Sequence, residues 1–225
     1  MAKAHGMNLQ VVAGRVKRVS TRTVKERTLT SLWVEGFGFA LLAWDAGGTS
    51  SAVSAKEGDY LYAEGRVQSR SYEKDGETKY VTEIVTHRLI NLSDGKAGNT
   101  TFAIGNLGRT PEMKYTPGGK AVTNVSLAAN AFGTEKPEWM NLVAWEKVGE
   151  ILNQYLDKGS RIAVAGRLVR DTWKGKGEHE GKSFQRTKLV VNDLLMLGGA
   201  NGNANSPADG GPPPMDDKEQ DEIPF

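Results

Sequence analysis

The chain repeats a set of residues at a constant offset of 101 positions. The matched pairs are Trp44 and Trp145, Gly58 and Gly159, Gly65 and Gly166, Arg66 and Arg167, and Tyr72 and Trp173. Self-similarity at one fixed period is the signature of a structural module made more than once. The sequence therefore predicts two copies of one module. Its 225 residues leave enough length in each copy to bury a core without disulfides or a metal.

The composition narrows the class of protein. The chain has no cysteine, which excludes a disulfide framework, thiolate metal ligands and a cysteine nucleophile. No apolar run approaches the ~18 residues of a membrane-spanning helix, and the first ten residues lack the apolar segment of a signal peptide. We therefore expect a cytoplasmic protein with no membrane segment.

The charge is divided unevenly along the chain. Residues 201–225 hold six acidic residues and one basic residue, so this end carries −5 and the other 200 residues carry +7. A basic body attracts polyanions, whereas an acidic end repels them. A charge of +7 is equally compatible with a role in solubility alone.

Each copy is predicted to contain the same order of elements. The first has strands over 7–18, 19–34 and 39–44, weak helical material over 45–57, and two more strands that flank the hairpin signal Asp75-Gly76. The second copy follows the same order, with an amphipathic helix in EKVGEILNQYLDKG that we expect Gly159 to end. Five strands with a helix between the third and fourth is the OB-fold order.

The predicted fold class is all-β: two tandem OB-fold barrels, each with one short helix, followed by a disordered acidic C-terminal tail. The tail is rich in Gly, Asn and Pro until its last residues and lacks the apolar surface that would offset the entropy of ordering. The expected boundaries are 7–93 for the first, more divergent domain, 94–100 for a linker, 101–199 for the second domain and 200–225 for the tail.

No constellation of residues indicates catalysis. His5, His87 and His179 are the only histidines, and none has the spacing of a metal-ligand or catalytic motif. The short glycine turns match neither phosphate-binding loop pattern. We expect a protein that is not an enzyme, with no catalytic residue, no cofactor and no metal.

Aromatic residues beside basic residues give the stronger signal. Aromatic rings stack on bases for ~1–3 kcal/mol per base, and Lys and Arg follow the phosphates of a single strand. For Trp44 and Trp145 a place in the barrel core is an equally good interpretation, but Tyr72 and Trp173 end strands among charged residues, where a core residue is less expected. The stacking candidates are Trp33, Trp44, Tyr72, Phe132, Trp139, Trp145 and Trp173, and the basic candidates are Arg66, Arg70, Lys114, Lys147, Lys158, Arg167, Arg170 and Lys174.

The second copy resembles bacterial single-stranded DNA-binding protein. The segments that carry the resemblance are IGNLGRTPEMKYTPGGKAVTNVSLAAN, EWMNLVAWEKVGEILNQYLDKGSRIAVAGRL, DTWKGK and LMLGG. The resemblance implies that Phe132, Trp139, Trp145 and Trp173 lie at or near stacking positions. It also implies that Lys114, Lys147 and Lys158 are basic positions of the site. Trp145 stands where the family usually has Phe, and the first copy matches only loosely.

The resemblance also carries expectations about assembly and partners. Two OB domains in one chain are similar to the branch found in the Deinococcus–Thermus group, which implies a homodimer that supplies four OB domains. The implied function is sequence-independent binding and protection of single-stranded DNA in replication, recombination and repair, at the nucleoid. The end of the chain resembles the acidic tip that recruits replication and repair proteins, here Asp221, Glu222, Ile223, Pro224 and Phe225. The alternative is an OB-fold protein for structured RNA or another ligand that is not single-stranded DNA.

Overall fold

The computed structural model describes residues 6–45, 54–74, 76–130, 134, 136–175, 180 and 183–198. The chain divides into two compact units, residues 8–102 and residues 103–225 with 1–7. We call the described parts of these units the N-terminal barrel and the C-terminal barrel. Strand β6 (Gly98–Leu107) begins inside the range predicted as a linker. The domain boundaries given above stay predictions.

The N-terminal barrel is a closed ring of five strands. They are β1 (Met7–Val24), β2 (Arg27–Val34), β3 (Ala40–Trp44), β4 (Tyr60–Lys74) and β5 (Glu77–Leu92). β1 pairs with β2 and β4 antiparallel, β2 with β3, and β4 with β5. A parallel pairing of β3 with β5 closes the ring. This strand order is that of an OB-fold barrel.

Alternate positions of these strands face the barrel interior. Val12, Leu32, Leu41, Leu61 and Ile84 are each at most 1% exposed. Burial of a side chain of this size contributes ~1.5–3 kcal/mol, so the inward positions hold the barrel together. The residues between them point outward.

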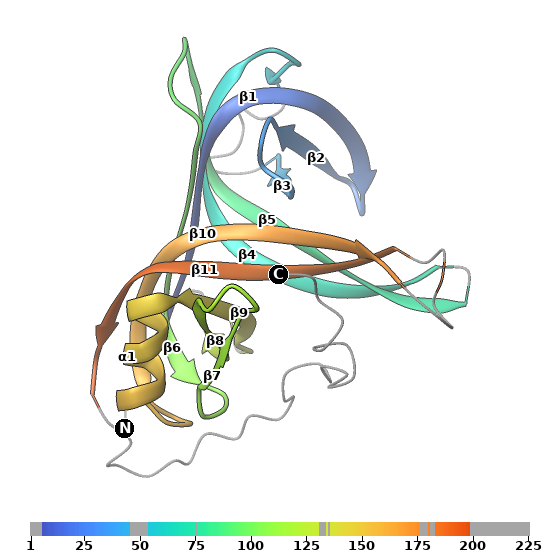
Figure 1. The fold of residues 1–225 in the computed structure, drawn as a ribbon. Coiled ribbons are helices and arrows are strands. Elements are labelled where there is room, and N and C mark those ends of the chain that lie inside the picture. The colour runs from blue at the N-terminus through green and yellow to red at the C-terminus, as the bar shows by residue number, and fades with distance from the viewer. Residues whose placement is uncertain are drawn as a thin grey trace. The chain divides into compact units, whose positions relative to one another are not determined.

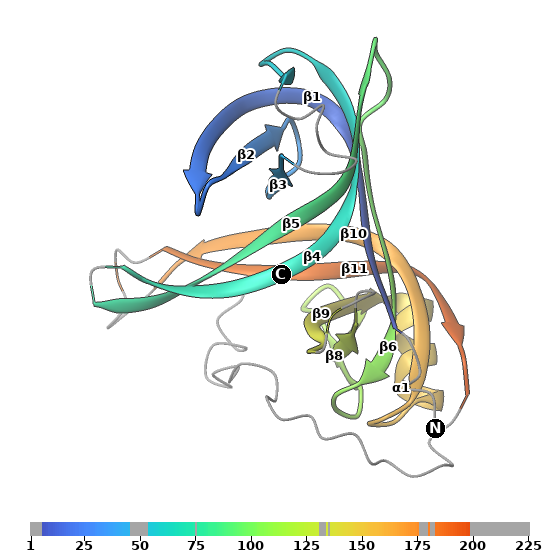
Figure 2. The same ribbon diagram turned by 180° about the vertical axis from the view of Figure 1, so that it is seen from behind.

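The hairpin predicted at Asp75-Gly76 is present. Lys74 is directly opposite Glu77, so two residues connect β4 to β5. Gly76 has φ +77°, which a glycine adopts without strain. Figures 1 and 2 show β4 and β5 running side by side as one long curved hairpin.

The C-terminal barrel repeats this plan. It contains β6, β7 (Glu112–Tyr115), β8 (Ala121–Ala129), β9 (Glu138–Trp145), α1 (Glu146–Tyr155), β10 (Arg161–Lys174) and β11 (Ser183–Met196). The ring order is β6, β8, β9, β11, β10 and back to β6, with β7 added beside β8. The helix lies between the third and fourth strands of this ring. The predicted all-β class with tandem OB-folds is confirmed.

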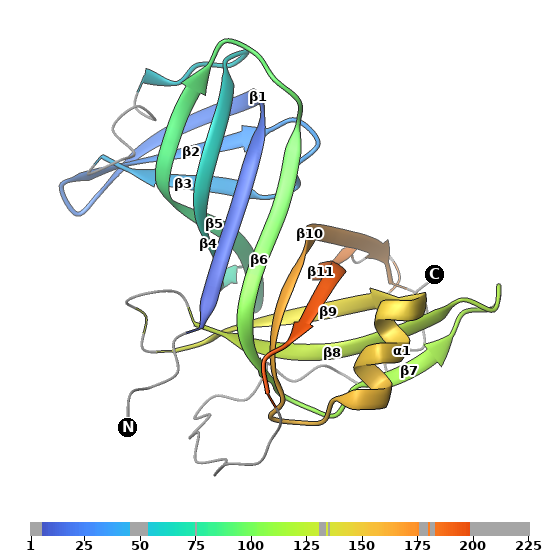
Figure 3. The ribbon, with the colours of Figure 1, turned by 90° about the vertical axis from the view of Figure 1, so that its left-hand side faces the viewer.

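Helix α1 packs closely against its own barrel. Figure 3 shows it lying across β8, with which it shares contacts. The hydroxyl of Thr123 donates a hydrogen bond to the carbonyl of Gly149 at 2.9 Å. A β-carbon at Gly149 would lie 2.7 Å from the carbonyl oxygen of Ala144, so only glycine permits this approach.

The predicted end of the helix is wrong. The helix ends at Tyr155, and Leu156 is extended and buried. Gly159 instead has φ +88° in the turn that leads into β10. The packing of Leu156 into the core overrides the local stop signal that Gly159 provides.

The helix predicted for the first copy falls mostly outside the described residues, since 46–53 are not among them. In the part of the chain that the structure describes, none of the helices has the length and apolar character needed to span a membrane.

Candidate nucleic-acid interface

The five tryptophans all lie between core and solvent. Each of them is half-buried, and none belongs to the buried hydrophobic core. Trp44 and Trp145, for which a core position was an equal alternative, follow the same rule. Tyr72 is 41% exposed. The rings are therefore held by the fold and still reach the surface.

Two tryptophans share the outward face of the N-terminal barrel. Trp33 on β2 is opposite Ala40 on β3, and Leu29 on β2 is opposite Trp44 on β3. Because directly opposed residues lie on the same side of a sheet, Trp33 and Trp44 face the same way. Along the strand direction they are offset by four positions, about 13 Å.

The same outward face continues onto β5 and β4. Leu42 is opposite Val85, and Val85 is opposite Arg66. The two-residue period then places Arg70 and Tyr72 on this face as well. The register thus gives all five candidate residues of the N-terminal barrel an outward position.

Arginines that were not among the candidates join the same face. Arg18 on β1 is opposite Trp33, and its guanidinium carbon lies 4.9 Å from the centroid of the Trp33 ring. Arg22 is opposite Leu29. The guanidinium carbon of Arg27 lies 5.1 Å from the centroid of the Trp44 ring. Each of the two tryptophans therefore has a cation against its ring.

Asp45 anchors the strand beside Arg27. Its carboxylate accepts a hydrogen bond from the N–H of Thr28 at 2.8 Å and lies 3.6 Å from Arg27. The hydrogen bond from the Thr28 backbone is the main reason that the pKa of Asp45 lies below its ordinary value. Both groups of the ion pair are largely exposed, so the pair itself contributes little stability.

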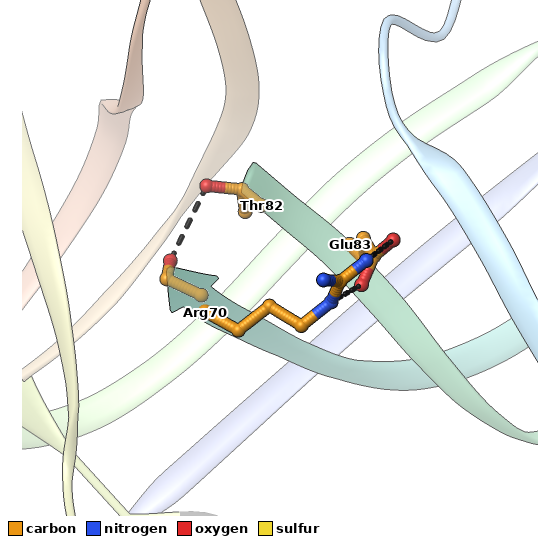
Figure 4. A network of polar contacts seen from close by, with 4 residues as sticks. Arg70, Thr82 and Glu83 are labelled. Atoms are coloured by element: carbon orange, nitrogen blue, oxygen red, sulfur yellow. Dashed lines mark hydrogen bonds and ion pairs between the residues drawn. The ribbon is translucent and has the colours of Figure 1, made fainter. Parts of the chain in front are cut away.

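Arg70 is already engaged within its own hairpin. Figure 4 shows its side chain reaching Glu83 on the neighbouring strand. Nε donates to Oε2 of Glu83 at 2.8 Å, and an Nη donates to Oε1 at 3.1 Å. The hydrogen bonds to Glu83 raise the pKa of Arg70. Its charge is therefore matched by a carboxylate before any ligand arrives.

The C-terminal barrel has an outward face of the same kind. On β9, Trp139 is opposite Ala128 and Trp145 is opposite Val122. Lys114 on β7 is also opposite Val122, which places it in one row with Trp145. The two tryptophans are six positions apart on the strand, about 20 Å. This face thus offers two rings and an exposed ammonium group.

Trp139 is positioned by a glycine. A β-carbon at Gly108 would lie 2.4 Å from the edge of the Trp139 ring and 2.6 Å from the hydroxyl oxygen of Ser126. The edge of the ring therefore packs against backbone that has no side chain. This contact fixes the ring without covering it fully.

Trp173 lies on the long hairpin of β10 and β11. It is opposite Phe184, and the two rings are stacked with centroids 5.9 Å apart and planes 19° apart. The guanidinium carbon of Arg186 lies 5.9 Å from the centroid of the Trp173 ring. Arg167 has the same outward parity as Trp173. The sequence had given no role to Phe184 or Arg186, although their spacing of two is the period of a strand face.

Other candidates lie elsewhere. Arg170 and Lys174 are an odd number of residues from Trp173, so they point to the opposite face of the hairpin. Burial lowers the pKa of Arg170. Lys147 lies in the first turn of α1 and Lys158 in the turn before β10, and both are exposed.

Several candidates lie outside the described residues: Phe132, Asp221, Glu222, Ile223, Pro224 and Phe225. Among the residues that are described, no three or more His, Asp or Glu side chains are grouped so that they could hold a metal ion.

Comparisons with known proteins agree with this geometry. The model of the single-strand binding protein family matches residues 98–197. A single-stranded DNA-binding protein of Neisseria meningitidis is 37% identical over 113 residues, which are 47% of this chain and 63% of the relative. A single-stranded DNA-binding protein of Xylella fastidiosa is 30% identical over 162 residues, with 56% of this chain and 97% of the relative covered. The chain thus spans less than two thirds of the Neisseria protein.

Among solved structures, the wild-type single-stranded DNA binding protein from Thermus aquaticus is similar over most of both chains. The TM-score is 0.69 at 24% identity, with 89% of this chain and 98% of that chain covered. A deletion mutant of the same protein gives a TM-score of 0.68, also at 24% identity, over 86% of this chain and 96% of that one. At this identity the likeness concerns the fold.

Proposed function

Because the chain belongs to the single-strand binding protein family, we propose that it binds single-stranded DNA without sequence preference and does not convert it. The observation that supports this most is the pair of outward faces, each with two half-buried tryptophans and basic side chains in register with them. The boundaries predicted from the sequence would then separate two binding domains and a tail.

The rings supply the affinity for bases and the cations supply the affinity for phosphates. Every base has a π face, so stacking on Trp139 or Trp33 does not select a sequence. Lys and Arg displace the counterions of the strand, so the affinity should fall as salt rises. The spacing of the rings, about 13 Å and about 20 Å, leaves room for intervening nucleotides.

Tryptophan fluorescence tests the choice of ligand. We expect oligo-dT to quench it, and duplex DNA and hairpin RNA to quench it much less, because paired bases do not expose their faces for stacking. Equal quenching by all three would favour the alternative, a protein for structured RNA. No change with oligo-dT would contradict the proposal.

The tail is proposed to recruit replication, recombination and repair proteins. It carries −5 and ends in Ile223, Pro224 and Phe225. Acidic residues would steer this end toward basic pockets, and the apolar tip would be buried there with its carboxylate bound by Arg or Lys.

Deletion of Ile223–Phe225 should leave the affinity for oligo-dT within about two-fold, because the DNA-binding charges and rings are elsewhere. It should abolish the recovery of DNA replication and repair enzymes in a pull-down from bacterial extract. The matched control removes three other tail residues, Pro212–Pro214, and should keep both properties. If the variant without Ile223–Phe225 loses DNA binding as well, the proposed division of roles between barrels and tail is wrong.

A homodimer with four barrels is the proposed assembly. When one DNA strand is bound at one face, its effective concentration at the other three faces is high. The affinity of the whole assembly therefore exceeds that of a single face. Light scattering should give twice the mass of the 24.4 kDa chain with and without oligo-dT. A monomeric mass under both conditions would exclude this assembly.

A further inference from the structure

The positive charge of the N-terminal barrel is concentrated in one short segment. Residues 15–27 contain six basic residues and one acidic residue. The rest of the unit 8–102 contains seven basic and ten acidic residues, so outside this segment it is negative. The segment forms the end of β1, the turn and the start of β2. We call it the basic hairpin.

The basic hairpin presents its charges on the face that holds the tryptophans. Val24 is opposite Arg27, so the turn consists of Lys25 and Glu26 alone. From this turn the register places Arg22 opposite Leu29 and Arg18 opposite Trp33. Arg18, Arg22 and Arg27 are all exposed.

The long hairpin of the same barrel offers no net charge. Residues 66–85 contain four basic and four acidic residues. Arg70 is bound by Glu83 in a bidentate pair, and the Glu83 side chain is only 12% exposed. A phosphate would have to displace a carboxylate that is already desolvated and well oriented.

The equivalent hairpin of the C-terminal barrel carries a net positive charge. Residues 167–190 contain seven basic and three acidic residues. The positions that correspond to Arg70 and Glu83 hold Asp171 and Lys188, which form an ion pair with the charges exchanged. The two barrels therefore concentrate positive charge on different hairpins.

We infer that the N-terminal barrel binds the phosphates of a single strand through Arg18, Arg22 and Arg27 on the basic hairpin, and not through its long hairpin. This inference rests on the proposed function. The guanidinium groups of Arg18 and Arg27 lie against the rings of Trp33 and Trp44 in the free protein. When a base takes the place of a guanidinium on the ring, the arginine stays within reach of the adjoining phosphate, which its planar fork binds in a bidentate manner.

The test compares two double variants of the full chain that lose the same charge. Arg18→Gln/Arg22→Gln removes two cations from the basic hairpin, and Arg70→Gln/Lys79→Gln removes two from the long hairpin. The probe is labelled oligo-dT long enough to cover the whole protein, and the measurement is the affinity by anisotropy over a series of NaCl concentrations. Thermal melting of each variant confirms that it is folded.

For Arg18→Gln/Arg22→Gln we expect the slope of log Kobs against log salt to shrink by about 1.4, since each lost contact to a single strand accounts for ~0.7. Arg70→Gln/Lys79→Gln should keep the wild-type slope. Arg18→Lys/Arg22→Lys keeps the charge and should restore most of the slope. Equal losses in both glutamine variants, or an unchanged slope in the first, would overturn the inference. Wild-type protein that does not bind oligo-dT would instead contradict the proposed function.

Discussion

Replacement of Trp139 by alanine is expected to lower the affinity for oligo-dT by about 5- to 150-fold, the equivalent of ~1–3 kcal/mol for one lost base stack. Trp139 is half-buried on the outward face of β9, and its ring packs against Gly108. A ring that is already fixed loses little entropy when a base stacks on it. The variant loses both the π face and this preorganisation.

The measurement is the anisotropy of a labelled oligo-dT, because the substitution itself alters the protein fluorescence. Trp139→Phe keeps a ring and should lose much less affinity than Trp139→Ala. Tyr155→Ala is the matched control: it removes an aromatic ring that is 61% exposed on α1, away from the outward strand face. If Tyr155→Ala weakens binding as much as Trp139→Ala, exposed aromatic surface in general is responsible and the proposed face is wrong.

The barrels could be predicted from the sequence because their signals are local or periodic. The constant offset of 101 residues predicted two copies of one module, and the pattern of the second copy predicted the helix between the third and fourth strands. The residue types of Asp75-Gly76 alone predicted a hairpin with a two-residue turn. Such features need no knowledge of which strand pairs with which.

The role of Arg18 could not be predicted in the same way. It is opposite Trp33 because the turn lies at Lys25 and Glu26. It lies on the outward face, although Val16 two residues before it is buried, because the register shifts between Val16 and Arg18. Lys25 and Glu26 have φ +45° and +65°. A turn with such positive φ angles is predicted from Asn or Gly, and this turn contains neither. A shift of one residue would have sent Arg18 to the other face.

That Arg170 and Trp173 lie on opposite faces of their strand could have been predicted from the sequence. They are three positions apart, and an odd offset on one regular strand means opposite faces. Proximity in the sequence had grouped them as one site. The pairing of Arg70 with Glu83 was beyond such reasoning, because the two residues meet across a hairpin in a diagonal position.

Gly166→Ala is expected to destabilise the C-terminal barrel by about 3 kcal/mol, at the upper end of the usual cost of overpacking. A methyl group at Gly166 would lie 2.1 Å from the carbonyl oxygen of Val190 and 3.1 Å from a methyl group of Leu189. The oxygen belongs to the neighbouring strand, so relief requires a shift of the backbone beside the bulge at Ala165 and Gly166. The barrel is closed, and its pairing leaves little freedom for such a shift.

Urea unfolding followed by tryptophan fluorescence measures this effect, since Trp139, Trp145 and Trp173 report on the C-terminal barrel. Gly118→Ala is the control, because the nearest atom to its new methyl group is 3.9 Å away, and its midpoint should stay at the wild-type value.

Gly65 has the same place in the N-terminal barrel, where a methyl group would lie 2.6 Å from the carbonyl oxygen of Val85. If the two barrels are copies of one design, Gly65→Ala should lower the stability of that barrel for the same reason. If Gly166→Ala and Gly118→Ala unfold at the same urea concentration, the close approach of the strands does not require the glycine that is repeated at positions 65 and 166.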